Sequence, residues 1–135
     1  MRLLEEKILK DGQIINNDII KVDSFLNHQI DPNIIVALAK DIRDFFKDTK
    51  VDKILTIEAS GIAIAFAVAE QFNNCPIVFA KKSKSATVGD DVYQTEIKSF
   101  TRNKVSTVTV CNKYLNKDEK ILIVDDFLAE GNAAM

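Results

Sequence analysis

Apolar residues along the first part of the chain recur at helical spacing. Leu4 and Ile8 lie one turn apart, which predicts a short helix over residues 2–10. A second helix is predicted from Pro32, which suits the first helical position, with the carboxylate of Asp31 as its cap. The apolar positions of this second helix are Ile34, Ile35, Leu38, Ile42, Phe45 and Phe46.

Further along, the pattern changes from helical spacing to short apolar runs of the kind that form strands. An alanine-rich helix through about Phe72 follows the first of these runs. The runs at residues 76–80 and 121–124 contain no charged residue, so we expect both strands to be buried on both faces of a sheet. Residues 14–29 show no clear period and stay unassigned. The predicted strands cover residues 53–58, 76–80, 105–111 and 121–124.

Strands that alternate with helices favour an α/β fold with a mainly parallel sheet flanked by helices. In such sheets, ligands bind beyond the carboxyl ends of the strands. No internal repeat, low-complexity tract or linker divides the chain, and a length of 135 residues suits one domain. The sequence therefore predicts a single domain over residues 1–135.

Composition and charge narrow the class of protein. Lysine and arginine total 18 against 20 acidic residues, and this balance argues against a protein that binds nucleic acid or a membrane surface. The longest uncharged apolar run, residues 62–69, is far shorter than the about 18 residues that a transmembrane helix needs. Glu5 and Glu6 interrupt any signal-peptide core, so we expect a cytoplasmic protein. Two cysteines without metal-ligand spacing and a single histidine argue against a zinc site, a disulfide framework or a histidine-dependent triad.

Two acidic residues, Asp125 and Asp126, directly follow the last predicted strand. After them comes a turn of mainly small residues, 129–133, that leads into a predicted helix. The backbone N–H groups of this turn could hold a phosphate, helped by the positive end of the helix dipole. The adjacent carboxylates could accept hydrogen bonds from sugar hydroxyls or take part in holding Mg²⁺. The alternative is a solvated pair of acids and a glycine turn without a ligand.

The two preceding strand ends carry further polar residues. Residues 58–61 (Glu-Ala-Ser-Gly) follow the first strand, and Lys81, Lys82 and Lys84 follow the second. Cations beside paired carboxylates are the arrangement expected where pyrophosphate and a metal lie between them. The alternatives are a strand-to-helix turn in which Ser60 caps the helix, and a solvated loop of lysines.

The string from Ile121 to Ala133 resembles the phosphoribosyl-pyrophosphate signature of the type I phosphoribosyltransferases. It has four apolar residues, two acids and a short phosphate loop with a glycine. Residues 21–31, 56–63 and 78–82 are similar to segments of the bacterial xanthine phosphoribosyltransferases. This resemblance runs from Met1 to Met135 with matching order and spacing.

The resemblance implies an enzyme that transfers the 5-phosphoribosyl group from phosphoribosyl pyrophosphate to xanthine. The products would be xanthosine 5'-monophosphate and pyrophosphate, in purine salvage. Mg²⁺ would be carried with phosphoribosyl pyrophosphate rather than by metal-ligating residues of the chain. The family also implies a homodimer, for which the apolar pair Phe25–Leu26 is a candidate surface. The alternatives are a regulator that binds phosphoribosyl pyrophosphate and a non-catalytic truncated remnant of the same fold.

The resemblance also implies roles for individual residues. Asp125 and Asp126 are the expected catalytic acids, which meet the ribose hydroxyls and tolerate positive charge at the anomeric carbon. Ile20 and Asn27 are expected to contact the purine, to which Asn27 can offer both a donor and an acceptor. The alternative for Asn27 is a turn or helix-approach residue that makes backbone bonds. The positions expected to bind the phosphates of phosphoribosyl pyrophosphate are Ala59, Ser60, Lys81, Ala129, Glu130, Gly131, Asn132 and Ala133.

Finally, the resemblance divides the domain into parts. Residues 1–31 would form a base-binding segment, and the polar stretch 83–104 a flexible flap that screens the reacting centre from water. A plain surface hairpin is the alternative to the flap. The C-terminal strands and the base-contacting lysine of the family have no counterpart before Met135. We therefore expect the domain to be incomplete, with these C-terminal strands missing, and the chain to be inactive by itself.

Overall fold

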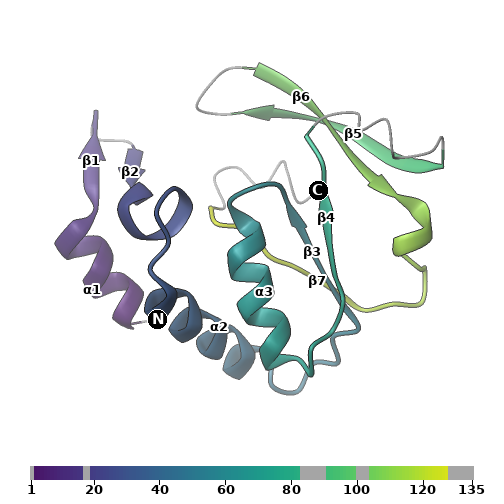
Figure 1. Ribbon diagram of the computed structural model, residues 1–135, viewed down its shortest axis with the longest axis horizontal. Helices are drawn as coiled ribbons and strands as arrows, with labels where there is room; N and C mark the ends of the chain where they lie inside the picture. Colours follow the sequence, from purple (N-terminus) through teal and green to yellow (C-terminus); the bar gives the residue numbers. More distant parts are fainter. Residues whose placement is uncertain (1, 17–18, 83–90, 100–103, 128–135) are drawn as a thin grey trace.

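A computed structural model describes residues 2–16, 19–82, 91–99 and 104–127 (Figure 1). Helices and strands alternate over residues 32–80, as the sequence predicts. The helical elements are α1 (Arg2–Asp11), the π-helical turn η1 (Asp23–Asn27), α2 (Pro32–Phe45), α3 (Gly61–Gln71) and the short helical turn η2 (Asn112–Tyr114). The strands are β1 (Gln13–Ile15), β2 (Ile19–Lys21), β3 (Lys53–Ile57), β4 (Ile77–Ala80), β5 (Val92–Ser99), β6 (Lys104–Cys111) and β7 (Ile121–Ile123).

The described residues form a three-stranded parallel sheet with the order β4-β3-β7 (Figure 1). Strand β3 lies in the middle, where Ile54 pairs with Ile77 of β4 and with Leu122 of β7. All three strands are rich in branched aliphatic residues, which pack well on a pleated surface. Because both pairings are parallel, the carboxyl ends of the three strands meet at one edge of the sheet.

Helix α3 packs against the sheet, and α2 packs against α3. Fully buried side chains from η1, β3 and α3 meet in the core, among them Phe25, Ile54 and Ile64. The alanines of α3, such as the fully buried Ala65, let this helix lie close to its neighbours. This is the predicted α/β architecture. No helix in the described ranges has the length and apolarity that crossing a bilayer requires.

The start of α2 confirms the predicted cap. Asp31 Oδ1 accepts a hydrogen bond from the backbone N–H of Asn33 at 3.0 Å, and Pro32 takes the first helical position. The other carboxylate oxygen of Asp31 lies 3.6 Å from Lys7 Nζ. The cap residue therefore also connects α1 to α2.

Residues 14–29, which the sequence leaves unassigned, form the β1–β2 hairpin and η1. The described residues of both hairpin strands are exposed, which explains why no apolar alternation marks them. In η1, Phe25 and Leu26 are only 1% and 5% exposed, and both belong to the core. The pair therefore belongs to the core and offers no surface to a partner, and the homodimer stays a prediction from the family resemblance.

Two apolar strands are less buried than predicted. Phe79 of β4 is 41% exposed and Ile123 of β7 is 48% exposed. Both strands lie at the edges of the described sheet, and an apolar run does not reveal which strand is an edge strand. Phe45 is likewise 82% exposed, because the buried face of α2 runs through Ile34 and Ile35.

Strand β5 pairs with β6 as an antiparallel hairpin over its whole length. Residues 92–99, within the stretch expected to form the flap, thus form one arm of this hairpin. Residues 83–90 and 100–103 lie outside the described residues, and the flexible flap stays a prediction. The backbones of Lys81 and Thr109 form a bridge that joins this hairpin to the end of β4.

An ion pair holds the amino-terminal end of β3. Lys53 Nζ lies 2.8 Å from both carboxylate oxygens of Glu119 and also donates to the backbone carbonyl of Tyr114. The Lys53 and Glu119 side chains are only 10% and 23% exposed. Hydrogen bonds from Lys53, and from the backbone and side-chain N–H groups of Asn116, lower the pKa of Glu119 to about 2.

We predict that Glu119→Gln flattens the acid dependence of stability. The folded-state pKa of Glu119 is about 2, below its ordinary value of 4.5. Its contribution to stability is therefore present above pH 4.5 and is lost as the pH falls from there toward 2. Thermal unfolding followed by circular dichroism should give Glu119→Gln a lower Tm than the wild type at pH 7. It should also give a smaller further decrease of Tm across that acidic range.

The matched control is Glu5→Gln, which changes an exposed carboxylate on α1. This variant should keep the wild-type Tm at neutral pH and the wild-type acid dependence. An unchanged Tm at pH 7 for Glu119→Gln, with an unchanged acid dependence, would show that the ion pair does not stabilise the fold.

Candidate active site

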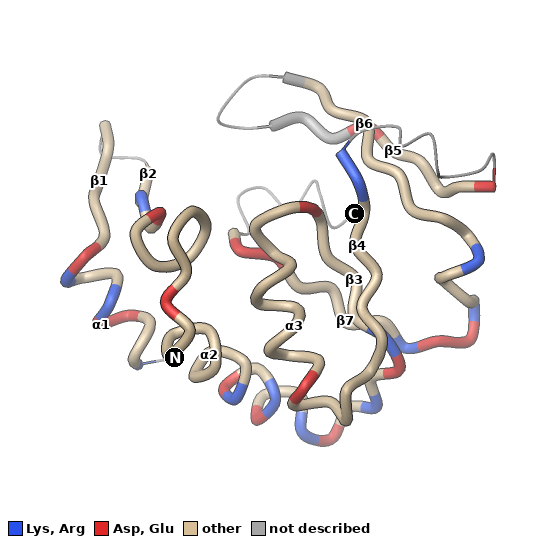
Figure 2. Tube along the Cα trace, in the orientation of Figure 1, with Lys and Arg blue, Asp and Glu red and all other residues tan. Residues whose placement is uncertain are grey.

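The carboxyl ends of β3, β4 and β7 bring acidic and basic segments to one edge of the sheet. Figure 2 shows acidic residues where β3 and β7 end and basic residues where β4 ends. These segments are residues 58–61 after β3, Lys81–Lys82 after β4 and Asp125–Asp126 after β7. The predicted juxtaposition of the three segments is confirmed for these residues, and it follows from the parallel register.

Asp125 and Asp126 leave the sheet just after β7. The backbone N–H of Val124 donates to the carbonyl of Leu55 at 2.9 Å, so the chain stays paired with β3 up to the acids. The backbone N–H of Asp126 then donates to Asp125 Oδ1 at 2.9 Å.

The surroundings of Asp125 also change the pKa of its carboxyl group. Asp125 keeps an exposed side, but desolvation by the atoms around its carboxylate raises its pKa. A side-chain hydrogen bond with Asp126 and the charge of Asp126 raise it further, against the opposing effects of the Asp126 backbone N–H and of Lys82. Interacting carboxylates with a perturbed pKa, placed at the ligand-binding edge of a parallel sheet, are typical of a functional site.

Glu58 and Lys82 join the other two segments. The backbone N–H of Lys82 donates to Glu58 Oε1 at 2.5 Å. The backbone of Lys81 pairs with Thr109 of β6 in both directions, at 2.9 and 3.0 Å. The charge of Lys82 acts on the carboxylate of Asp125. Lys82, one of the three lysines that the sequence places after this strand, therefore lies near the acids, and the assignment of Lys81 to pyrophosphate stays a prediction.

The loop after β3 leads directly into α3. Ser60 precedes the helix, but its side chain makes no capping hydrogen bond. The segment is therefore a strand-to-helix turn with Ser60 at the N-cap position, as the alternative has it, but the capping bond expected from the Ser60 side chain is not formed. Ala59 is exposed and Ser60 is half-buried, so both are open to a ligand at this edge.

Gly61, the first residue of α3, occupies a position that has no room for a side chain. A Cβ at Gly61 would lie 2.2 Å from Thr56 Oγ1 and 3.3 Å from Asp125 Oδ1. The first distance is far shorter than a van der Waals contact. The absence of a side chain therefore lets α3 begin directly against β3 and beside the first acid. The sequence pattern gave Thr56 no role.

Asn27 connects the N-terminal segment to the sheet edge. Its Nδ2 donates to Asp126 Oδ2 at 3.1 Å, across 99 positions of sequence. A predicted purine contact and a predicted ribose contact therefore lie side by side. Asn27 is also the last residue of the η1 turn, and its contact with the purine stays a prediction. Ile20, the other predicted purine contact, is 44% exposed in the β1–β2 hairpin, which lies beyond η1 from the sheet (Figure 1). The structure does not bring Ile20 to the acids.

The predicted phosphate loop falls outside the described residues, which end at Phe127 on this side. Its assignment to the 5-phosphate stays a prediction. The positions concerned are Ala129, Glu130, Gly131, Asn132 and Ala133.

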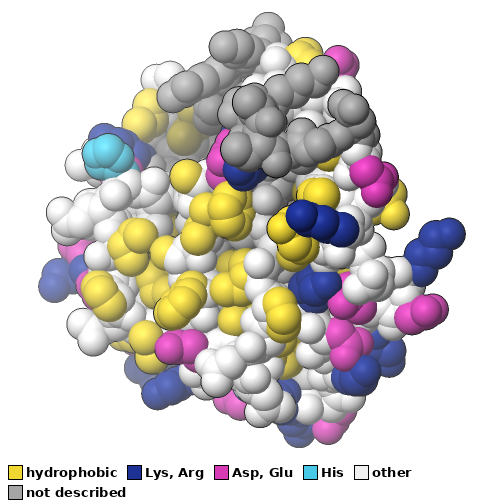
Figure 3. All heavy atoms as spheres, turned by 45° about the vertical axis from the view of Figure 1, so that its right-hand side comes forward, with side chains coloured by type: hydrophobic (Ala, Val, Ile, Leu, Met, Phe, Trp, Pro, Cys, Tyr) yellow, Lys and Arg dark blue, Asp and Glu magenta, His cyan; other side chains and the backbone are white. Residues whose placement is uncertain are grey.

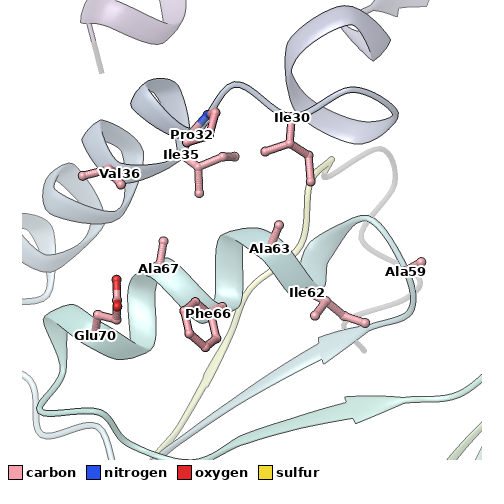
Figure 4. Close-up of a pocket in the computed structure, with 10 residues that line it drawn as sticks. All are labelled: Ile30, Pro32, Ile35, Val36, Ala59, Ile62, Ala63, Phe66, Ala67 and Glu70. Carbon is pink, nitrogen blue, oxygen red and sulfur yellow. The ribbon is translucent and has the colours of Figure 1, made fainter.

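Beside this edge, α2 and α3 line an apolar groove of about 600 Å³ (Figure 4). One end of the groove reaches Ala59 in the loop after β3, and the lining is apolar apart from Glu70. Three of its large side chains, Ile30, Val36 and Phe66, are 44%, 41% and 62% exposed. Figure 3 shows hydrophobic side chains gathered on one face of the molecule. Exposed apolar patches of this kind mark interaction surfaces.

A comparison with known protein families matches residues 21–133 to the phosphoribosyl transferase domain. The chain therefore belongs to the phosphoribosyl transferase family, and the family resemblance of its motifs is confirmed. Among curated relatives, the xanthine phosphoribosyltransferase of Clostridioides difficile is 56% identical over 135 residues, which cover 100% of this chain and 71% of the relative. The xanthine phosphoribosyltransferase of Finegoldia magna is 53% identical over 133 residues, which cover 98% of this chain and 70% of the relative.

Solved structures support the same fold. The adenine phosphoribosyltransferase of Rhodothermus marinus matches 99% of this chain and 75% of its own chain, with a TM-score of 0.71. Its sequence identity is only 13%, so this likeness concerns the fold alone. The predicted type I phosphoribosyltransferase-like fold is confirmed.

We predict that Gly61→Ala destabilises the protein. The new Cβ would overlap Thr56 Oγ1 and press on Asp125 Oδ1, so that α3 must shift away from β3. Overpacking of this kind costs about 1–3 kcal/mol. Urea denaturation should therefore show a lower midpoint for the variant.

Ser60→Ala is the matched control, because Ser60 is adjacent and forms no cap. Its free energy of unfolding should stay within about 0.5 kcal/mol of the wild type. A Gly61→Ala variant as stable as the wild type would mean that the contact between α3 and β3 has room to adjust.

Proposed function

We propose that this chain forms the site of a cytoplasmic enzyme of purine salvage. The enzyme transfers the 5-phosphoribosyl group from phosphoribosyl pyrophosphate to xanthine and gives xanthosine 5'-monophosphate and pyrophosphate. The observation that carries the proposal is the gathering of Asp125–Asp126, residues 58–61 and Lys81–Lys82 at one sheet edge. It is supported by identities of 56% and 53% to relatives named xanthine phosphoribosyltransferase.

In this proposal Asp125 and Asp126 orient the ribose. Ionised carboxylates accept hydrogen bonds, so the pair suits two sugar hydroxyls. Their negative charge also stabilises the positive charge that develops at the anomeric carbon as its bond to pyrophosphate weakens. Positioning and electrostatics supply the catalysis, and no covalent nucleophile is required.

The leaving pyrophosphate is met on the other side by the loop after β3 and by the end of β4. Ala59 and Ser60 offer backbone N–H groups and a hydroxyl, and Lys81 and Lys82 offer positive charge. The described residues contain no group of three or more His, Cys, Asp or Glu side chains placed to hold a metal ion. The family resemblance supports the proposal that Mg²⁺ enters bound to phosphoribosyl pyrophosphate, where it would offset the charge of the leaving group.

Asn27 is the described residue best placed to meet the purine. Because the Asp126 carboxylate can only accept, Asn27 Nδ2 must face it. The Oδ1 atom and the second N–H of Asn27 are then left for the base. A site that bonds the 2-oxo group of xanthine rejects purines that lack this group. Ile20 stays a proposed apolar contact from β2.

We predict that the protein uses xanthine in preference to guanine and hypoxanthine, and does not use adenine. Formation of each nucleotide from phosphoribosyl pyrophosphate and Mg²⁺ should be followed by absorbance.

Asp126→Ala should weaken the binding of phosphoribosyl pyrophosphate by about 1–3 kcal/mol, the scale for a hydrogen bond to a charged partner. Isothermal calorimetry would measure this loss.

Asp118→Ala, which removes an exposed acid near the opposite end of the sheet, is the control and should bind phosphoribosyl pyrophosphate as the wild type does. A preference for adenine would overturn the assignment of the base. Unchanged affinity in Asp126→Ala would remove Asp126 from the site.

We also propose that the protein is a homodimer in which a second copy covers the groove between α2 and α3. Phe25 and Leu26 are buried, so an apolar dimer interface has to use other residues. The groove presents Phe66 together with exposed side chains of α2, and apolar area of this kind is buried at the core of dimer interfaces.

Phe66→Glu should convert the dimer to a monomer, because it places a charge in the apolar interface. Sedimentation velocity at micromolar concentrations would measure the change. Phe45→Glu is the control, since Phe45 is 82% exposed on α2 and does not line the groove. A wild-type monomer, or a Phe66→Glu dimer, would refute this interface.

A further inference from the structure

Thr56 carries a buried hydroxyl without a hydrogen-bond partner. The residue lies in the central strand β3 and is only 1% exposed, and its Oγ1 finds neither a donor nor an acceptor in the described structure. Buried hydroxyls are almost always paired, because an unmade hydrogen bond leaves the cost of desolvation without compensation. A valine would fill the same space without this cost, so the hydroxyl at Thr56 requires an explanation.

The Thr56 hydroxyl faces the gap left by the missing side chain of Gly61. The point where a Gly61 Cβ would lie is 2.2 Å from Thr56 Oγ1 and 3.3 Å from Asp125 Oδ1. The two oxygen atoms therefore border the same small space at the start of α3. One belongs to a hydroxyl without a partner, and the other to the first acid of the candidate site.

The two residues differ in how firmly they are held. Thr56 pairs with Phe79 of β4, and β3 is also bonded to β7 on its other side, so the hydroxyl has a fixed position. Asp125 follows the end of β7 and is exposed on one side. Its Oδ1 already accepts the backbone N–H of Asp126 at 2.9 Å, and a carboxylate oxygen can accept a second donor. Asp125 is therefore the residue of the two whose side chain is free to turn toward the other.

We propose that Thr56 is a positioning residue for Asp125. Its hydroxyl donates to Asp125 Oδ1 when phosphoribosyl pyrophosphate binds, and this hydrogen bond turns the other carboxylate oxygen toward the ribose. Gly61 is the third part of the arrangement, because any side chain there would separate the two oxygens. This inference rests on the proposed function, since it assigns Asp125 to the ribose. It adds a residue that never touches the substrate.

Three variants test the role of the Thr56 hydroxyl in the full protein. Thr56→Val removes the hydroxyl and keeps the shape, and Thr56→Ser keeps the hydroxyl. Thr109→Val is the matched control, because Thr109 is 5% exposed and its hydroxyl is also unpartnered, but it lies on β6. For each variant, calorimetry gives the Kd of phosphoribosyl pyrophosphate, steady-state kinetics give KM and kcat, and a thermal melt gives Tm.

Thr56→Val should raise the Kd and KM for phosphoribosyl pyrophosphate about tenfold, the effect of losing a hydrogen bond to a charged group. Its Tm should not fall, because an unpartnered hydroxyl is replaced by an apolar group of the same shape. Thr56→Ser should bind within about twofold of the wild type because it keeps the donating hydroxyl, and Thr109→Val should do so because it changes a residue outside the proposed hydrogen bond.

Several results would overturn the proposal. If Thr56→Val binds phosphoribosyl pyrophosphate as the wild type does, the hydroxyl has no positioning role and the proposed function stands. If Thr56→Ser loses as much affinity as Thr56→Val, packing and not the hydroxyl is responsible. An equal loss in Thr109→Val would mean that the effect is not specific to Asp125. If the wild type does not bind phosphoribosyl pyrophosphate, the proposed function fails and this inference fails with it.

Discussion

Strand β3 is hydrogen-bonded to β4 on one side and to β7 on the other, and the candidate site depends on this double pairing. Both pairings are parallel, so the chain leaves all three strands at the same edge. A shift by one residue in either register would turn every side chain of that strand to the opposite face. The ion pair of Lys53 with Glu119 holds one end of β3, and the bond from Val124 to Leu55 holds β7 against it near the other.

The start of α3 adds a second constraint, which acts through the absence of a side chain. Thr56 Oγ1 and Asp125 Oδ1 border the space that a side chain of Gly61 would fill. Because α3 can begin there, its first N–H groups lie at the edge where the acids and lysines gather, and helix N-termini favour anions. A larger residue would move α3 and the loop 58–61 away from the sheet. The same close contact therefore packs the helix and shapes the loop that we assign to pyrophosphate.

The start of a helix could be predicted where neighbouring residues determine it, but the burial of individual side chains could not. Asp31 marks the start of α2 because a carboxylate cap and a following proline act within a few residues. The exposure of Phe79 and Ile123 depends instead on strand order, which is a property of the whole fold. Phe25 and Leu26 show the same limit: in a segment without a period, neither residue reveals which way it faces, and both are buried in η1.

The candidate site follows a similar division. The gathering of the polar residues at the strand ends could be predicted, because a parallel sheet brings the carboxyl ends of its strands to one edge. No such rule joins Asn27 to Asp126, since their hydrogen bond spans 99 positions. It depends on η1, whose buried Phe25 anchors the turn in the core and so brings Asn27 to the end of β7. A substitution in this core that displaces η1 would therefore separate the purine contact from the ribose contact without touching either residue. Thus the chemistry of each site residue is local, while the contact between the two proposed substrate sites is a consequence of core packing.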